Sequence, residues 1–343
     1  MAVSKYTEYN VYAKPKYLSN DSILVQNFLF SPSINTSFFI NAEKPEINRI
    51  PEIIEFFSEM YGMYPFYKEK YGHCVVPIGG GMEHQTMTSQ GFMHLFWLNV
   101  HELAHQWFGN SVTCKSWSDI WINEGFASYS EHLANEYLRP LEFNSHLSAA
   151  HGEVMTLPGG SCHFTGADTL RTSRIFDSRL TYDKGGAIIH TLRFVTNNDS
   201  LWFNTLRDFQ NTYKGGNASV TDFMAMYHTK TGIDPGQFFQ QWYYGEGYPT
   251  FDVEWMEQSG GIVLRSKQTT SRPTVTPLFI TPVEYSIKRA NRPDTAVRLL
   301  HDEAVEQYTV PVSGSVTAVW IDADNWLINR AIGPVKVESL GVG

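Results

Sequence analysis

A His-Glu-x-x-His segment at residues 101–105 is the clearest chemical pattern in the sequence. Residues four apart lie on one face of a helix, with Cβ atoms about 5–6 Å apart, so His101 and His105 can bind one metal ion together. Glu102 is rotated by about 100° from His101 around the helix axis, so its carboxylate flanks the metal and does not ligate it. The pattern predicts one zinc ion, with Glu102 as the general base for a zinc-bound water.

Glu124 offers a third ligand at the start of the next predicted helix, within WINEGFA (121–127). Two histidines and one carboxylate are a ligand set of a catalytic zinc ion that keeps one coordination position open. The apolar helix around His101 and His105 also favours a metal site, because two unpaired buried imidazoles would be costly. Asp119 is a weaker candidate, as a hydrogen-bond partner of a ligand imidazole.

Composition and charge exclude several other function classes. The 343 residues include 26 Lys and Arg against 35 Asp and Glu, a formal net charge of −9. No basic block is present, so nucleic acid and anionic membranes are not expected as partners. No apolar run is long enough for a membrane span, and the polar first ten residues lack a signal-peptide core. Three cysteines are too few for a disulfide framework, which leaves one bridge or none.

Hydrophobic periodicity predicts mixed strands and helices up to about residue 249. Short apolar runs at 22–30 and 36–40 read as strands, and the spacing over 45–62 predicts a helix that stops at Gly62. The two metal-binding segments are expected on helices over 92–108 and 123–138. The second helix would be capped by Asn123 and stopped by Pro140, a Gly- and Ser-rich loop is expected over 152–173, and further helices follow at 182–195, 200–213, 220–232 and 235–245.

The texture changes after Gly247-Tyr248-Pro249. Phe251, Val253 and Trp255 alternate with polar residues, and strand-like segments continue without a helical stretch. We therefore expect two domains. Residues 1–249 would form the catalytic domain, with 1–40 as its first strands, and residues 250–343 would form a small β-sandwich.

These motifs resemble those of the zinc aminopeptidases related to aminopeptidase N and to leukotriene-epoxide hydrolase. That family has HExxH, eighteen residues and then Glu; here the eighteen residues are 106–123. Three further motifs match in order: Gly-x-Met-Glu-Asn corresponds to residues 80–84, Tyr-x-Lys-Gly to residues 182–185, and Gly-Tyr-Pro to residues 247–249. The resemblance runs from about residue 1 to about residue 338.

The resemblance implies an α/β (α+β) fold, with a thermolysin-like catalytic domain and a small all-β sandwich. It implies a zinc aminopeptidase that acts on peptides with a free N-terminus. Tyr182 would donate to the oxyanion of the tetrahedral intermediate, and Glu83 would bind the substrate's α-ammonium group. Gly80, Gly81, Met82 and His84 would complete the substrate-binding segment, with His84 in place of the family's Asn as a larger donor and acceptor.

Family members usually carry an N-terminal β-saddle domain and often a C-terminal helical domain, which do not fit into 343 residues. We expect either a fragment of a larger enzyme or a minimal enzyme with an open cleft, monomeric or covalently linked to further domains. The family's use of external peptides favours export. Alternatives are a thermolysin-type endopeptidase, an epoxide hydrolase side activity and an inactive zinc scaffold that binds peptides. Substrate side-chain preference cannot be read from the motifs.

Overall fold

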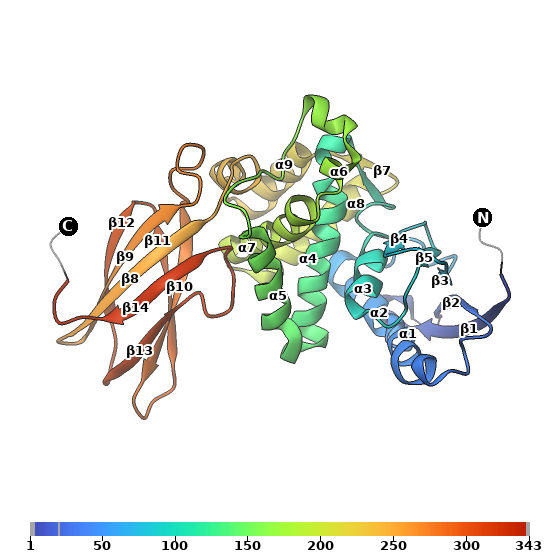
Figure 1. Cartoon of the computed structure of the whole chain (residues 1–343), viewed down its shortest axis with the longest axis horizontal. Coiled ribbons are helices and arrows are strands. Elements are labelled where there is room, and N and C mark those ends of the chain that lie inside the picture. The colour runs from blue at the N-terminus through green and yellow to red at the C-terminus, as the bar shows by residue number, and fades with distance from the viewer. Residues whose placement is uncertain (1–3, 20, 341–343) are drawn as a thin grey trace.

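The computed structural model describes residues 4–19 and 21–340, which form three regions along the long axis of the molecule (Figure 1). A mixed sheet lies at the N-terminal end, a group of helices fills the middle, and a β-sandwich lies at the C-terminal end. The mixture of helices and sheets confirms the predicted α+β class. In the described residues, all three cysteines are free and no helix is long and apolar enough to cross a membrane.

The N-terminal sheet has five strands in the order β1-β2-β3-β5-β4. β1 and β2 are antiparallel, β2 and β3 and then β3 and β5 are parallel, and β4 is antiparallel to β5 at the edge. The two-residue strand β4 therefore presents one open edge. The strands are β1 (Tyr6–Ala13), β2 (Ile23–Phe30), β3 (Tyr71–Val75), β4 (Gly81–Met82) and β5 (Thr88–Gln90).

The strand predicted over residues 36–40 is wrong, because this segment begins a helical region. The hydroxyl of Thr36 accepts a hydrogen bond from the Phe39 N–H at 3.1 Å, and the Thr36 carbonyl accepts from the Ile40 N–H at 3.1 Å. A three-residue apolar run is too short to set a period, so this local cap decides the structure. The region continues as η2 (Phe39–Glu43), α1 (Lys44–Ile47) and α2 (Ile50–Tyr61), and α2 ends at Gly62 as predicted.

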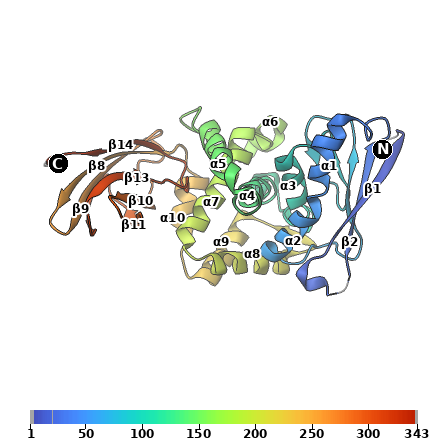
Figure 2. The ribbon, with the colours of Figure 1, turned by 90° about the horizontal axis from the view of Figure 1, so that it is seen from below.

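Helix α4 (Trp121–Leu138) is the central element of the helical region, and Figure 2 shows it end-on among its neighbours. Most of its residues are buried, as expected of a helix with other elements on all sides. Its approach to α7 requires glycine, because a Cβ on Gly185 would lie 3.2 Å from the Cα of Gly125. The surrounding helices are α3 (Phe96–Ala104), α5 (Pro140–Val154), α7 (Gly185–Thr196), α8 (Asp199–Tyr213) and α9 (Val220–Thr231).

Two predicted helix starts are also corrected. Helix α3 begins at Phe96 and not near residue 92. Helix α4 begins at Trp121, so Asn123 is not its cap; the Asn123 side-chain oxygen instead accepts from the Cys114 N–H at 2.9 Å. Asn123 thereby ties β6 (Val112–Cys114) to the helix. The predicted loop over 152–173 contains the end of α5 and two short turns, η4 (Gly166–Leu170) and α6 (Thr172–Ile175).

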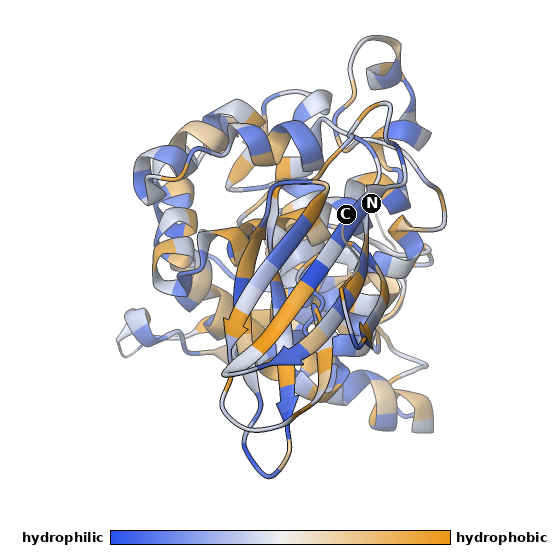
Figure 3. Ribbon diagram, turned by 90° about the vertical axis from the view of Figure 1, so that its left-hand side faces the viewer, coloured by the Kyte–Doolittle hydropathy of each residue, from blue (hydrophilic) through white to orange (hydrophobic). Residues whose placement is uncertain are grey.

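The C-terminal region has two packed sheets, with strand orders β12-β9-β8-β14 and β11-β10-β13. Phe251, Val253 and Trp255 of β8 are buried in the core between them. Figure 3 faces this sandwich and shows that both hydrophobic and hydrophilic residues occur along its strands. The strands are β8 (Pro249–Gln258), β9 (Gly261–Thr270), β10 (Thr281–Arg289), β11 (Thr295–His301), β12 (Val305–Pro311), β13 (Val316–Ile321) and β14 (Arg330–Lys336). A domain boundary at residue 249 coincides with the start of β8 and stays a prediction.

Candidate active site

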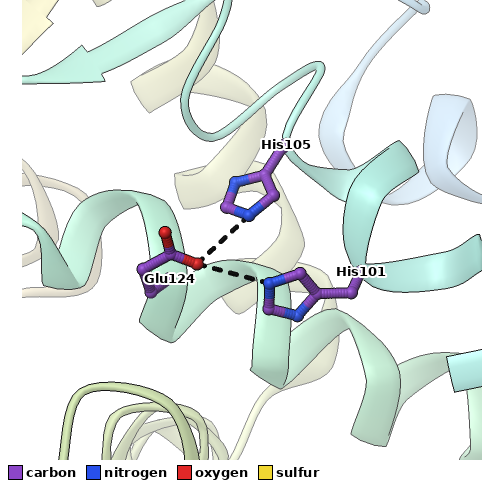
Figure 4. A group of neighbouring side chains, drawn as sticks. All are labelled: His101, His105 and Glu124. Carbon is purple, nitrogen blue, oxygen red and sulfur yellow. Dashed lines mark hydrogen bonds and ion pairs between the residues drawn. The ribbon is translucent and has the colours of Figure 1, made fainter. Parts of the chain in front are cut away.

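Helix α3, with His105 directly after its last residue, and helix α4 bring His101, His105 and Glu124 together (Figure 4). Glu124 Oε2 lies 3.3 Å from His101 Nε2 and 3.2 Å from His105 Nε2. One potential ligand atom from each residue lies within 4.8 Å of the other two, and all three side chains are buried. Two nitrogens and one carboxylate oxygen facing a common point are a donor set that suits a zinc ion.

The outer nitrogens of both imidazoles are occupied. His101 Nδ1 lies 2.8 Å from Glu131 Oε1, and His105 Nδ1 lies 2.9 Å from the Phe108 carbonyl oxygen. With the proton on Nδ1, each Nε2 lone pair faces Glu124, which is the tautomer that a metal requires. Glu131 was not found from the sequence as a partner of His101, although it lies seven residues after Glu124 and hence on the same face of α4.

Asp119 is not the imidazole partner that we expected. Its Oδ1 accepts from the Val220 N–H at 3.0 Å, and its Oδ2 accepts from the Ser116 hydroxyl at 2.6 Å. These contacts fix the short turn η3 (Trp117–Asp119) against the start of α9. Asp119 therefore stabilises the approach to α4 and makes no contact with either histidine.

Burial and charge act in opposite directions on the three candidate ligands. Burial alone would lower the pKa of His105, but the charge of Glu124 outweighs it and raises the pKa to about 9. The same holds for His101: burial would lower its pKa, but Glu124 and Glu131 together outweigh burial and raise the pKa above its usual range. Burial would raise the pKa of Glu124, but the two histidines lower it to about 2. The carboxylate is therefore ionised, and its negative charge stabilises positive charge on the groups around it.

Glu102 lies beneath the edge strand β4. A Cβ on Gly81 would lie 2.5 Å from the Glu102 carboxyl carbon, so a larger residue here would displace either the strand or the Glu102 side chain. Glu102 Oε2 is buried and has no hydrogen-bond partner among the described residues. Burial, more than the nearby charges, raises the pKa of Glu102 to about 7.

Tyr182 stacks beside His101, with ring centroids 5.7 Å apart and an interplanar angle of 26°. Burial, with a smaller contribution from Glu124, raises the pKa of this phenol, so it stays protonated and can donate. Tyr182 belongs to the π-helical segment η5 (Ser178–Lys184) that precedes α7. The buried Lys184 fixes this segment, because its Nζ donates to the carbonyl oxygens of Gly160 at 2.8 Å and Gly245 at 3.2 Å.

Glu83 is positioned through its backbone. Its carbonyl oxygen accepts from the Asn110 side-chain amide at 2.7 Å and faces the Gln106 amide at 3.5 Å. Both residues follow His105, so the end of the metal-binding segment holds the segment that carries Glu83. His84 is exposed and its Nδ1 lies 3.2 Å from the Ser89 hydroxyl.

A cavity of about 700 Å³ joins these groups. It is lined by the candidate ligands, by Glu102 and Tyr182, and by Gly80, Gly81, Met82 and Glu83. His84 is the one predicted site residue that does not line it. Its lining includes five carboxylates and, among the described residues, no Lys or Arg; the five are Glu83, Glu102, Glu124, Glu131 and Asp183.

Comparison with known sequences adds a family to this geometry. Residues 46–242, more than half of the chain, match the peptidase family M1 domain. The chain belongs to peptidase family M1. The matched range contains α3 and α4, which carry the candidate metal ligands, and the segments of Glu83 and Tyr182, so the resemblance seen in the sequence motifs is confirmed.

Curated M1 relatives include peptidases from bacteria and animals. Aminopeptidase N of Lactobacillus helveticus is 31% identical over 175 residues, which are 49% of this chain and 20% of that protein. The thyrotropin-releasing hormone-degrading ectoenzyme of Mus musculus is 34% identical over 166 residues, 45% of this chain and 15% of that protein. This chain therefore spans a fifth or less of these two M1 relatives.

Solved M1 structures share the fold. A mutant of a two-domain M1 zinc metallopeptidase bound to L-tryptophan aligns with a TM-score of 0.58 at 22% identity, over 69% of this chain and 51% of that one. A mutant M1 zinc metallopeptidase from Deinococcus radiodurans, bound to a Tyr-Ser-Ala substrate, aligns with a TM-score of 0.56 at 24% identity, over 68% of this chain and 51% of that one. These alignments agree with the α+β architecture of an M1 peptidase.

Proposed function

We propose that this chain is a zinc aminopeptidase that hydrolyses the first peptide bond of peptides with a free N-terminus. The observation that carries the proposal is the convergence of His101, His105 and Glu124 at one wall of a cavity that Glu102 and Tyr182 also line. Membership of family M1 and the activity named for its aminopeptidase N relatives support the same reading.

His101, His105 and Glu124 would hold one zinc ion. When bound, zinc acts as a Lewis acid toward the scissile carbonyl and makes water a stronger nucleophile. Glu102 would accept the proton of the attacking water and deliver it to the leaving nitrogen, a role typically worth about 10²–10⁴ in rate. Glu131 would keep His101 in the tautomer and orientation that ligation needs.

Tyr182 and Glu83 would each bind one polar group of the substrate's N-terminal residue. The protonated phenol of Tyr182 would donate to the oxyanion that develops on the carbonyl oxygen. The Glu83 carboxylate would bind the α-ammonium group by charge-assisted hydrogen bonds. Gly80, Gly81 and Met82 would place the edge of β4 beside the substrate backbone, as in recognition by strand addition.

Hydrolysis of alanyl- and leucyl-arylamides by the zinc-loaded chain tests the proposal. We expect cleavage of the free-amine substrates, no cleavage of their N-acetylated forms, and loss of activity on chelation of the metal or in Glu102→Ala. Glu142→Ala, which removes an exposed carboxylate on α5, is the matched control and should retain activity.

Three outcomes would contradict the proposal. Equal cleavage of acetylated and free substrates would indicate an endopeptidase, for which Glu83 has no use. Activity that survives in Glu102→Ala would remove the assigned base. A folded, zinc-bound chain that cleaves nothing but binds peptides would be a binding module.

A further inference from the structure

The charges that line the cavity do not balance with the proposed substrate alone. Its five carboxylates would face one zinc ion and one α-ammonium group, which together carry three positive charges. Glu124 would ligate the metal, Glu102 would act on the water, and Glu83 would pair with the ammonium group. Glu131 and Asp183 then remain in a cavity whose described lining contains no Lys or Arg.

Asp183 and Glu131 both have acceptor capacity to spare. The Asp183 carboxylate makes no hydrogen bond or ion pair with another described residue. Glu131 uses Oε1 on His101, while its Oε2 lies 3.9 Å from His146 Nε2. Burial, followed by the charge of Glu131, raises the pKa of Asp183 to about 7, so a cation at this point would stabilise the ionised form.

His132 provides an independent indication of a ligand at this end of the cavity. It lines the same cavity, is 3% exposed, and neither ring nitrogen has a hydrogen-bond partner in the described structure. Its ring centroid lies 5.1 Å from that of His146, whose Nε2 also has no hydrogen-bond partner. Buried polar atoms are almost always paired, so a ligand with several hydrogen-bonding groups fits this position. Burial keeps the pKa of His132 well below its usual range, so the ring is neutral and offers an acceptor.

We call Glu131, His132, His146 and Asp183 the acidic chamber. A guanidinium group fits it better than an ammonium group, because it offers five N–H donors in one plane to acceptors that are spread around the chamber. Trp97, which is 45% exposed, also lines the cavity and provides an aromatic face for stacking.

The position of Glu83 indicates which substrate residue reaches the chamber. Its carbonyl is held by Gln106 and Asn110, beyond His105, whereas Glu131 contacts His101, one helical turn earlier. A peptide anchored at Glu83 by its amine would place the cleaved bond at the metal ligands and continue past His101 toward the chamber. We infer that the acidic chamber binds the guanidinium group of an arginine directly after the cleaved bond. This inference rests on the proposed aminopeptidase function and names its substrate class.

The experiment compares kcat/KM for Ala-Arg-Ala with that for Ala-citrulline-Ala, since citrulline keeps the shape of arginine without its charge. We expect the wild-type chain to prefer arginine by about tenfold or more, the ratio that corresponds to one charge-assisted hydrogen bond. In Asp183→Asn the ratio should fall to below about threefold. The matched control is Glu153→Gln, which removes an exposed charge near Asp183 that does not line the cavity, and it should keep the wild-type ratio.

Alanyl-arylamide, which has no amino acid after the cleaved bond, separates failure of this inference from failure of the proposed function. Cleavage of the arylamide with equal kcat/KM for arginine and citrulline peptides would overturn the chamber and leave the aminopeptidase in place. No cleavage of any substrate would overturn the proposed function itself. A preference for arginine over citrulline as the N-terminal residue, with no preference at the second residue, would overturn the inference that the chamber binds the residue after the cleaved bond. If Asp183→Asn does not fold, the wild-type ratio still decides.

Discussion

At the scale of single residues, the candidate site depends on contacts that restrict motion. His101 has Glu131 behind it and Tyr182 stacked beside it, so its ring has little freedom to turn. Glu102 is confined by the backbone of Gly81. Reacting groups held in this way need little reorganisation when a substrate binds, which is the main source of electrostatic catalysis.

Replacing Tyr182 by phenylalanine tests the phenol as an oxyanion donor. Loss of one such donor typically lowers kcat by about 10²–10³, and KM should change little because the donor acts on charge that develops in the transition state. Steady-state kinetics on leucyl-arylamide gives both constants. Tyr137→Phe, which removes a partly exposed phenol from α4, should leave kcat within about twofold; a comparable loss in both variants would remove the assigned role.

Replacing Gly81 by alanine tests the close contact between β4 and Glu102. The added Cβ would meet the carboxyl group at 2.5 Å, so either the strand or the Glu102 side chain must move. We expect kcat/KM to fall by roughly 10²-fold, since a displacement of about 1 Å at a reacting group has that effect. Gly79→Ala has open space around the new Cβ and should lose much less. Equal losses in the two variants would show that the contact with Glu102 is not the cause.

The two candidate histidine ligands are predictable from sequence because helical spacing alone places His101 and His105 on one face. Glu131 lies seven residues after Glu124 and therefore on the same face of α4. This spacing alone does not show that its carboxylate contacts His101. Asp183 and His132 lie on different elements that meet only through tertiary packing. Their proximity depends on the close approach of α4 to the segment before α7, and no local pattern encodes it.

At the scale of elements, a seam of histidines joins α4, α5 and α7. His132, His146, His151 and His190 contribute to it, and three of them are fully buried. Burial lowers the pKa of His151 to about 4 and holds the pKa values of His132 and His190 well below their usual range. Smaller contributions come from neighbouring histidines at His132 and from Arg193 and then His151 at His190. The folded chain therefore keeps these rings neutral.

This seam predicts acid sensitivity of the fold. In the unfolded chain a histidine takes up its proton below about pH 6.5, whereas folded His151 does so only near pH 4, so stability falls as pH drops between these values. At pH 5 the free energy of unfolding should be lower than at pH 7 by about 2 kcal/mol from His151 alone. Urea unfolding at both pH values measures the difference.

His151→Gln should remove its share of that loss, so the variant's stability should change less between pH 7 and pH 5 than that of the wild type. His228, which lies in α9 and is exposed, supplies the matched control. His228→Gln should keep the wild-type difference. The seam would be refuted as the cause if both variants keep it.

Element types follow from periodicity wherever an apolar stripe runs for three turns or more, as in α2 and α8. Predictions from periodicity fail where a local contact outweighs a short hydrophobic pattern. The hydroxyl of Thr36 turns an apolar triplet into the start of a helix. Asn is a common helix-capping residue, but α4 begins at Trp121, two residues before Asn123. The Asn123 side chain therefore lies inside the helix and contacts the backbone of Cys114.

At the scale of the whole molecule, the sandwich packs against α7. Trp326 stacks on His190 at 4.4 Å and on Phe194 at 5.1 Å, and its carbonyl accepts from the Thr191 hydroxyl at 2.8 Å. Phe194 itself packs into the core of the sandwich. Since α7 continues directly from the segment of Tyr182, these contacts support the candidate site from outside it. The composition of residues 250–343 predicts a sandwich, but not its docking surface, to which the loop of Trp326, Arg298 on β11 and Phe279 all contribute.

Replacing Trp326 by alanine tests that support. The change should lower the free energy of unfolding by about 2 kcal/mol, within the range of single substitutions that remove packing. Because the sandwich loses packing contacts with α7, proteolysis near residue 249 should become faster, and calorimetry should show a broader or split unfolding transition. Trp320→Ala, which removes a side chain that is more than half exposed on β13, should change neither. Unaltered melting of Trp326→Ala would show that the two regions are held by other contacts.

The hydrogen bond between Thr191 and Trp326 spans 135 residues of sequence, which has a consequence during biosynthesis. A ribosome that adds about 5–20 residues per second would need roughly 7–27 s to produce the partner of α7 after α7 has emerged. During that interval the nascent helix presents His190 and Phe194 without their aromatic cover. A chaperone that binds exposed apolar segments would find its target there, and the peptidase would mature only once the late loop arrives.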